Sequence, residues 1–230
     1  MNKNFLCLFL SLFVAMAMLS VKSAYAISDK QYAECKKLSK EFTQTEKDLN
    51  ALWKEVNSLI KNKDKKQQLL NNQRKWLKER DEEHIDENGV VDIPKFTYST
   101  QNRVVELLLY KEYVKNDFLP IKISGKVIEV GESRYSEETV YNLYTDLYVD
   151  KNKYNVWIPL CFSEQKKQRK DVDKILKKAE DNEDKCSILL AYDLLSEPRV
   201  ISFVNPSKNE KCTLNWETKV TGLLETTTAP

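Results

Sequence analysis

The residue types that most often perform acid–base chemistry are sparse in this 230-residue sequence. The single histidine, His84, stands in a run of carboxylates, where a histidine can bind a metal or shuttle protons, although a lone histidine on a charged helix end is more often simply solvated. No G-x-S-x-G, H-E-x-x-H or glycine-rich phosphate-binding sequence is present, and no spacing singles out a pair of carboxylates. We therefore predict a protein that is not an enzyme and that uses no metal or cofactor.

Four cysteines follow the N-terminal apolar stretch: Cys35, Cys161, Cys186 and Cys212. In an exported chain four cysteines favour disulfides, and the sequence does not choose between the three possible connectivities. We expect at least one bond among the three cysteines of the second half, and four reduced thiols are the alternative. Zinc is disfavoured because no two cysteines have the close C-x-x-C spacing of zinc ligands.

Aromatic side chains mark a second candidate site. Residues 140–149 and 154–162 alternate apolar and polar as neighbouring strands do, and Tyr144, Tyr148 and Trp157 fall on their outward side. Such a face can stack sugars or bases, so a glycan- or peptide-binding module is one hypothesis. The alternative is that the helical part or the tail of the chain covers these rings.

The charge balance bears on the partner. The chain has 37 Lys and Arg against 35 Asp and Glu, and neither half departs far from neutrality. A nucleic-acid-binding domain normally shows a basic excess, so we predict that nucleic acid is not a partner.

Residues 1–26 have the features of a cleaved signal peptide. Lys3 precedes an apolar stretch of about 15 residues, shorter than the roughly 20 of a membrane span. Small residues at Ala24 and Ala26 occupy the positions that a signal peptidase reads. No lipobox precedes a cysteine at the end of the stretch, so we predict a periplasmic or secreted protein that is not a lipoprotein. An uncleaved anchor is the alternative.

The elements that position these residues begin with a helical hairpin over residues 35–84. Apolar residues recur in steps of three and four in both arms, which keeps one stripe of each helix apolar. Residues 61–66 are charged, so the chain is expected to turn there and the arms to pack as an antiparallel pair. The stripes consist of Cys35, Leu38, Phe42, Thr45, Leu49, Leu52, Val56 and Leu59, and of Leu69, Leu70, Gln73, Trp76, Leu77 and Arg80.

A third helix is predicted from Ser99 or Thr100 to about Asn116, after an irregular stretch that contains Pro94. It would complete a helical domain of residues 27–118, because the pattern changes abruptly at Phe118-Leu119-Pro120.

From residue 121 the period becomes two, which predicts strands. Three strands, a helix over residues 166–181 and further strands follow one another, in the order of a five-stranded OB-type barrel. We therefore predict an α+β protein in which a small OB-like β-barrel with one helix spans residues 119–225. The tail, residues 226–230, is expected to be disordered.

The hairpin resembles the N-terminal domain of the LprI-type lysozyme inhibitors. The family motif has Leu-Asn with an aromatic residue three positions after the Asn, and later Gln-x-x-Trp and an Arg-Asp pair. The matching residues here are Leu49, Asn50, Trp53, Gln73, Trp76, Arg80 and Asp81. Family members usually carry a cysteine where this chain has His84, and often two cysteines in the first helix, of which only Cys35 remains.

The resemblance implies an exported, non-enzymatic helical domain, with inhibition of lysozyme as one attested role. Trp53 and Trp76 would fill the seam between the arms. Arg80 and Asp81 point in different directions on a helix and are poorly placed to pair, whereas Arg80 could reach Asn50 or a carboxylate on the facing helix. These residues are interpreted mainly as architectural, with direct partner contact as the alternative.

The acidic run after Trp76 supplies candidate partner-binding residues: Glu79, Glu82 and Glu83. Lysozymes are often basic, and complementary charge would speed the encounter with a cationic cleft. A solvated helix end is the simpler alternative. The predicted partner is thus a protein, such as a lysozyme, or a glycan.

Overall fold

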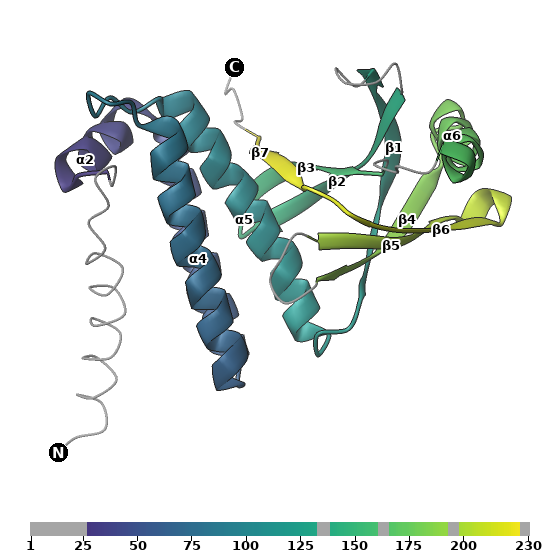
Figure 1. Ribbon diagram of the computed structural model, residues 1–230, viewed down its shortest axis with the longest axis horizontal. Helices are drawn as coiled ribbons and strands as arrows, with labels where there is room; N and C mark the ends of the chain where they lie inside the picture. The colour runs from purple at the N-terminus through teal and green to yellow at the C-terminus, as the bar shows by residue number, and fades with distance from the viewer. Residues whose placement is uncertain (1–26, 133–138, 161–165, 193–197, 226–230) are drawn as a thin grey trace.

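A computed structural model of the chain describes residues 27–132, 139–160, 166–192 and 198–225. Among the described residues, four helices precede a curved β-sheet and lie on one side of it, and a further helix lies at the far end of the sheet (Figure 1). The four helices are α2 (Asp29–Leu38), α3 (Lys40–Leu59), α4 (Lys63–His84) and α5 (Ile93–Lys115). The predicted signal peptide and the predicted tail lie outside the described residues.

The first arm of the predicted hairpin is divided into two helices at Ser39. This residue has extended backbone angles, and its side chain accepts a hydrogen bond from the Phe42 N–H, so it ends α2 and caps α3. Residues 60–62 join α3 to α4, and Arg80 near the end of α4 pairs with Glu46 near the start of α3. The two helices are therefore antiparallel, as predicted, but the expectation that they bury each other is not met, because α3 packs mainly against α5.

Helix α5 begins six residues earlier than the first position expected for it. The Asp92 side chain caps it by accepting from the Lys95 N–H, and Pro94 lies in the first turn. The interpretation of Pro94 as part of an irregular stretch is wrong, because proline is tolerated in a first turn, where the N–H that it lacks would have no partner.

Helix α5 is central to the packing. It contacts α3 and α4 on one side and strands of the sheet on the other. Twelve of its residues are buried, from Phe96 to Val114. This helix therefore cannot be a simple amphipathic rod, because nearly its whole circumference is covered.

The sheet has seven antiparallel strands, not the five of the predicted barrel, and it is not closed. The strand order is β6-β5-β4-β1-β2-β3-β7, which places the last two strands of the chain at opposite edges. Residues 212–224 thus contribute to two strands, β6 and β7. The strands are β1 (Ile121–Glu132), β2 (Thr139–Val149), β3 (Asn152–Pro159), β4 (Lys185–Tyr192), β5 (Pro198–Asn205), β6 (Glu210–Glu217) and β7 (Thr221–Leu224).

Curvature brings the two edges toward each other at Thr218, between β6 and β7. Its backbone N–H donates to the Pro198 carbonyl at 2.8 Å, and its hydroxyl donates to the Pro159 carbonyl at 3.1 Å. Pro198 belongs to β5 and Pro159 to β3, so one buried residue bridges the two halves of the open sheet.

One hydrophobic cluster joins the helices to the sheet. It includes Leu52 of α3, Val105 of α5, Ile158 of β3 and Leu176 of α6 (Lys166–Asp181), all almost completely buried. The segments predicted as domains, 27–118 and 119–225, therefore share a core. None of the described helices combines the length and apolarity that crossing a bilayer requires.

Candidate functional site

A groove of about 370 Å³ opens between α4, α5 and the end of the sheet. Helix α4 lines one wall with Trp76, Glu79 and Glu83, and α5 lines the other with Arg103 and Tyr110. Residues of the sheet side complete it, among them Tyr192 at the end of β4 and Lys219 after β6. The groove thus collects one tryptophan of the family motif and two of the three predicted partner-binding carboxylates.

Trp76 is only partly buried and is held between two guanidinium groups. The centre of the Arg80 guanidinium lies 4.9 Å from the ring centroid, and that of Arg103 lies 5.6 Å from it. Such cation–π contacts fix the orientation of the indole while part of it remains exposed. Trp53 is buried in the main core. Trp76 packs against the same core, and no ring contact joins the two indoles among the described residues.

Arg103 of α5 forms hydrogen bonds that connect the two helical walls of the groove. Its Nε donates to Gln73 Oε1 at 2.9 Å, and its terminal nitrogens donate to Asn72 Oδ1 at 2.5 Å and Glu106 Oε2 at 2.8 Å. Gln73 is buried, and a buried amide needs a hydrogen-bond partner, which it has here in Arg103 of α5. Sequence reasoning missed Arg103, although its i,i+3 spacing to Glu106 is typical of an ion pair on a helix.

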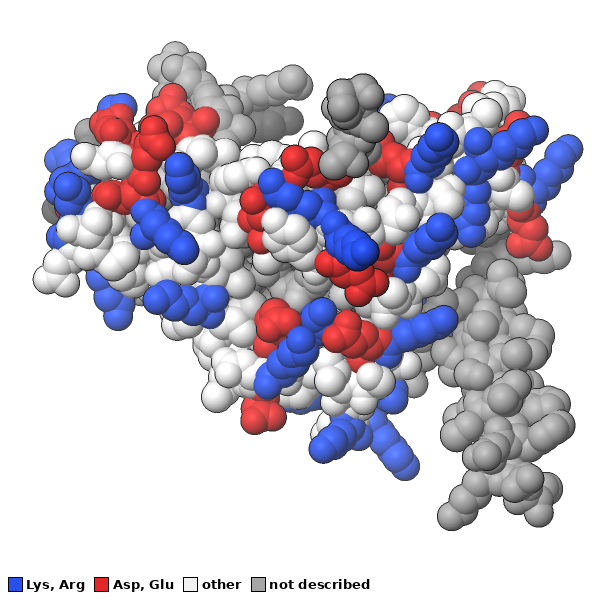
Figure 2. Space-filling view, turned by 180° about the vertical axis from the view of Figure 1, so that it is seen from behind, with Lys and Arg blue, Asp and Glu red and all other residues white. Residues whose placement is uncertain are grey.

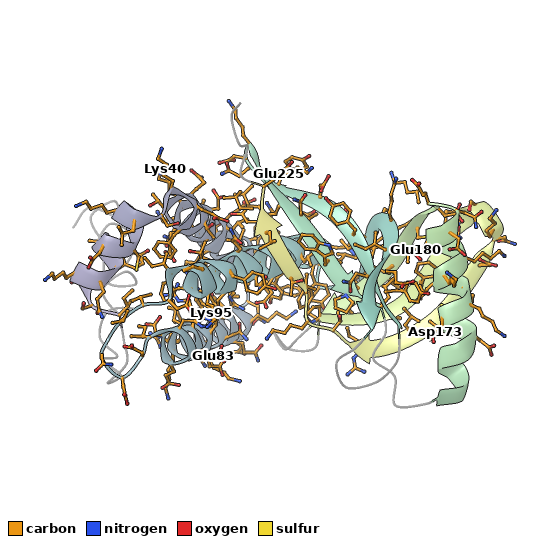
Figure 3. All side chains as sticks on the ribbon, turned by 90° about the horizontal axis from the view of Figure 1, so that it is seen from above. Lys40, Glu83, Lys95, Asp173, Glu180 and Glu225 are labelled. Carbon is orange, nitrogen blue, oxygen red and sulfur yellow. The ribbon has the colours of Figure 1, made fainter. Side chains whose placement is uncertain are left out.

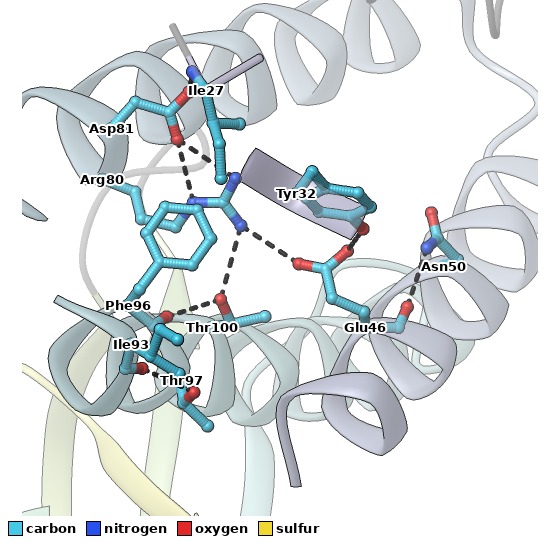
Figure 4. A network of polar contacts seen from close by, with 10 residues as sticks. All are labelled: Ile27, Tyr32, Glu46, Asn50, Arg80, Asp81, Ile93, Phe96, Thr97 and Thr100. Atoms are coloured by element: carbon cyan, nitrogen blue, oxygen red, sulfur yellow. Dashed lines mark hydrogen bonds and ion pairs between the residues drawn. The ribbon is translucent and has the colours of Figure 1, made fainter. Parts of the chain in front are cut away.

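Behind the groove lies a buried polar network around Arg80 (Figure 4). The guanidinium donates to Glu46 Oε1 at 3.1 Å and to Asp81 Oδ1 at 3.1 and 3.2 Å. It also lies 3.9 Å from the Phe96 ring centroid and 3.4 Å from the Thr100 hydroxyl of α5. All three charged side chains are almost fully buried.

The network corrects one expectation and confirms another. Arg80 and Asp81 do pair, because the long arginine side chain folds back so that its planar end meets the neighbouring carboxylate. Arg80 also reaches a carboxylate on the facing helix, Glu46, as expected. It does not reach Asn50, whose amide donates to the Glu46 carbonyl of its own helix. Leu49, the remaining motif residue, is buried in the main core.

Tyr32 of α2 completes this network. Its hydroxyl donates to the Glu46 carboxylate. Burial, the Glu46 charge and this hydrogen bond raise the pKa of Tyr32 well above its usual value, so the phenol is neutral and acts as a donor. The network thus contains one guanidinium group, two carboxyl groups and a neutral phenol.

The predicted acidic residues lie on α4 beside and within the groove. Glu79 and Glu82 each pair with a lysine one turn earlier, Lys75 and Lys78, at 3.6 Å. Glu83 is the most exposed, with 71% of its side chain accessible. His84 is largely buried rather than solvated as expected, and its Nδ1 has no hydrogen-bond partner. No cluster of three metal-ligating side chains is found in the described part of the chain.

The outward aromatic face of the sheet is present as expected. Tyr144 and Trp157 are direct neighbours on β2 and β3, with ring centroids 5.6 Å apart. Both are partly buried, and the Tyr144 hydroxyl donates to Asn155 Oδ1. Tyr148 is the exposed member, with 56% of its surface accessible. The face therefore presents one exposed ring beside a packed aromatic pair.

The predicted disulfides are not found among the described cysteines. Cys35, Cys186 and Cys212 are free thiols, and Cys161 lies outside the described residues. Cys186 and Cys212 lie on β4 and β6, which β5 separates, so the two are not neighbours. Burial raises the pKa of both thiols to about 11, which keeps them protonated at neutral pH.

Comparison with known proteins assigns the helical segment. The family model described as Lysozyme inhibitor LprI matches residues 23–108, which confirms the resemblance noted from the sequence motif. The match includes α2, α3, α4 and most of α5, and so both helical walls of the groove except Tyr110. Residues 109–230 remain unassigned, and no match was found among curated proteins or solved structures.

Proposed function

We propose that this protein, whose residues 23–108 match the lysozyme inhibitor LprI family, is an exported, non-enzymatic protein that binds and inhibits lysozyme through the groove between α4 and α5. The observation that carries the proposal is that the matched segment supplies both helical walls of this groove except Tyr110. The signal-peptide features of residues 1–26 support export to the periplasm or beyond the cell.

The chemistry of the groove suits a protein partner. Trp76 offers partly exposed aromatic surface that Arg80 and Arg103 hold in place, as the central residues of interfaces do. Glu79 and Glu82 pair with lysines of α4, and Lys219 also lines the groove, so the negative charge offered to a basic lysozyme comes mainly from Glu83, the most exposed of the three carboxylates. On the face that Figure 2 shows, acidic and basic side chains are interspersed and neither forms an extended patch.

We expect the purified mature protein to reduce lysozyme-catalysed lysis of bacterial cells at micromolar concentration. Replacing Glu79 and Glu83 together by lysine should raise the half-inhibitory concentration about tenfold, because the encounter loses its charge complementarity. The difference in half-inhibitory concentration between the variant and the unchanged protein should become smaller as salt is added, because salt screens the attraction between the charges. The measurement is a turbidity assay across inhibitor concentrations at two ionic strengths.

The matched control replaces Asp171 and Asp181 of α6 by lysine. Both are exposed and each pairs with a lysine on its own helix, at 3.9 and 3.2 Å. Helix α6, marked in Figure 3 by Asp173 and Glu180, lies at the opposite end of the molecule from Glu83. This control should inhibit as the unchanged protein does. No inhibition by the unchanged protein, or equal losses in both double variants, would contradict the proposed site.

The second candidate function is glycan or peptide binding by the aromatic face of the sheet. The exposed ring of Tyr148, beside the Tyr144–Trp157 pair, is the observation that favours it. A ligand found by array screening should then bind more weakly to Tyr148→Ala and Trp157→Ala while the circular dichroism spectrum is retained. A ligand whose binding is unaffected by both substitutions would exclude this face.

A further inference from the structure

The buried network around Arg80 is one positive charge short. The Arg80 guanidinium faces two carboxylates, Glu46 of α3 and Asp81 of α4. Tyr32 of α2, which donates to Glu46, and Thr100 of α5 are uncharged, and the exposed Lys36 lies over the Tyr32 ring, 4.3 Å from its centroid. An uncompensated buried charge is strongly unfavourable, so this site calls for a second cation.

The backbone nitrogen of Ile27 occupies the position that such a cation would take. It lies 3.3 Å from Asp81 Oδ2, the carboxylate oxygen that Arg80 does not bind (Figure 4). In the unprocessed chain this nitrogen is a neutral amide.

The start of the described chain is also firmly held. The Ile27 side chain packs against the small cluster of Cys35, Phe42 and Phe96. The next residue, Ser28, caps α2, and the Gln31 amide donates to the Gly89 carbonyl in the connection between α4 and α5. These contacts place the Ile27 nitrogen next to Asp81 independently of what precedes it.

We propose that cleavage of the Ala26–Ile27 bond makes the Ile27 nitrogen an ammonium group, which pairs with Asp81 and neutralises the buried network. A signal peptidase adds water across this bond, leaving a carboxylate on Ala26 and an amine on Ile27, and the amine takes up a proton. The nitrogen keeps its place and its acceptor but gains a full charge, and a charge-assisted hydrogen bond is about twice as strong as a neutral one. Removal of the leader thus stabilises the four-helix part of the fold.

The test uses the chain exported with its own leader. Mass spectrometry should find Ile27 at the mature N-terminus. A single glycine inserted between Ala26 and Ile27 moves the ammonium one residue away, leaves the net charge unchanged and keeps the Ile27 N–H as an amide donor. We expect this insertion to lower the Tm by about 4 °C or more. In an Asp81→Asn background the same insertion should have no effect.

Should Asp81→Asn fail to yield folded protein, Glu46→Gln serves in its place. It removes the other buried carboxylate and leaves Arg80 and Asp81 balanced, so the insertion should cost less than in the unchanged chain. A mature N-terminus at another residue would overturn the proposal. An insertion that leaves the Tm unchanged, or lowers it equally in every background, would overturn it as well. None of these outcomes depends on inhibition of lysozyme.

Discussion

Replacing Arg80 by methionine is expected to lower the free energy of unfolding by about 3–5 kcal/mol. Methionine fills much of the space of the arginine side chain, but it leaves the carboxylates of Glu46 and Asp81 buried without their shared cation. It also removes a cation from the rings of Trp76 and Phe96. Urea unfolding followed by circular dichroism measures the loss directly.

Arg74 provides the control on the same helix. It is exposed, so Arg74→Met should change the free energy of unfolding by no more than about 0.5 kcal/mol. A similar small effect for Arg80→Met would show that the two carboxylates are not held as charged groups in the folded protein. Inhibition of lysozyme should also weaken in Arg80→Met, because the ring of Trp76 loses one of its two supports.

Individual helices and strands with one buried face could be predicted, because the spacing of their apolar residues shows in a short stretch of sequence. Helix α6 runs from Lys166 to Asp181 as expected, and β2 and β3 show the alternation predicted for them, with Leu143, Val156 and Ile158 fully buried. Each of these elements has one face covered and one face open. Its pattern of apolar residues therefore identifies the element without knowledge of its neighbours.

The parts that sequence reasoning missed depend on contacts between distant segments. Helix α5 is covered on both sides, so its apolar residues show no single stripe, and its start was misplaced at Ser99 or Thr100. The placement of β6 and β7 at opposite edges depends on the curvature of the whole sheet, which no short window of sequence encodes.

The α4 side of the candidate site could be predicted from the sequence, but the α5 side could not, because it depends on contacts between distant segments. The motif identified Gln73, Trp76 and Arg80 on one helix, because their spacing is local. Their partners Arg103 and Thr100 come from α5, about 20 to 30 residues further along the chain. A motif read along one helix carries no information about which side chains a third helix brings to it, so the groove itself could not be foreseen.

A substitution at the contact between α5 and β7 is also expected to lower the stability of the protein strongly. A Cβ added at Gly222 of β7 would lie 2.3 Å from Val105 Cγ2 and 3.2 Å from the Asn155 carbonyl oxygen. The strand is fixed there, because the Gly222 N–H donates to Asn102 Oδ1 of α5 at 2.9 Å. We therefore expect Gly222→Ala to destabilise the protein by about 2–3 kcal/mol, although alanine in a strand is normally favoured over glycine. Urea unfolding of the variant and the unchanged protein gives this difference.

A double substitution identifies the cause. Val105→Ala alone should destabilise, because Val105 is fully buried, but it removes the methyl group that the Cβ introduced by Gly222→Ala would meet. The loss in the Gly222→Ala/Val105→Ala protein should then be smaller than the sum of the single losses by about 1 kcal/mol or more. Additive losses would mean that α5 and β7 are not packed together in solution. Non-additivity would show that the segment matched to the inhibitor family and the unassigned sheet unfold as parts of one core, so that changes in the sheet also reach the helices that line the groove.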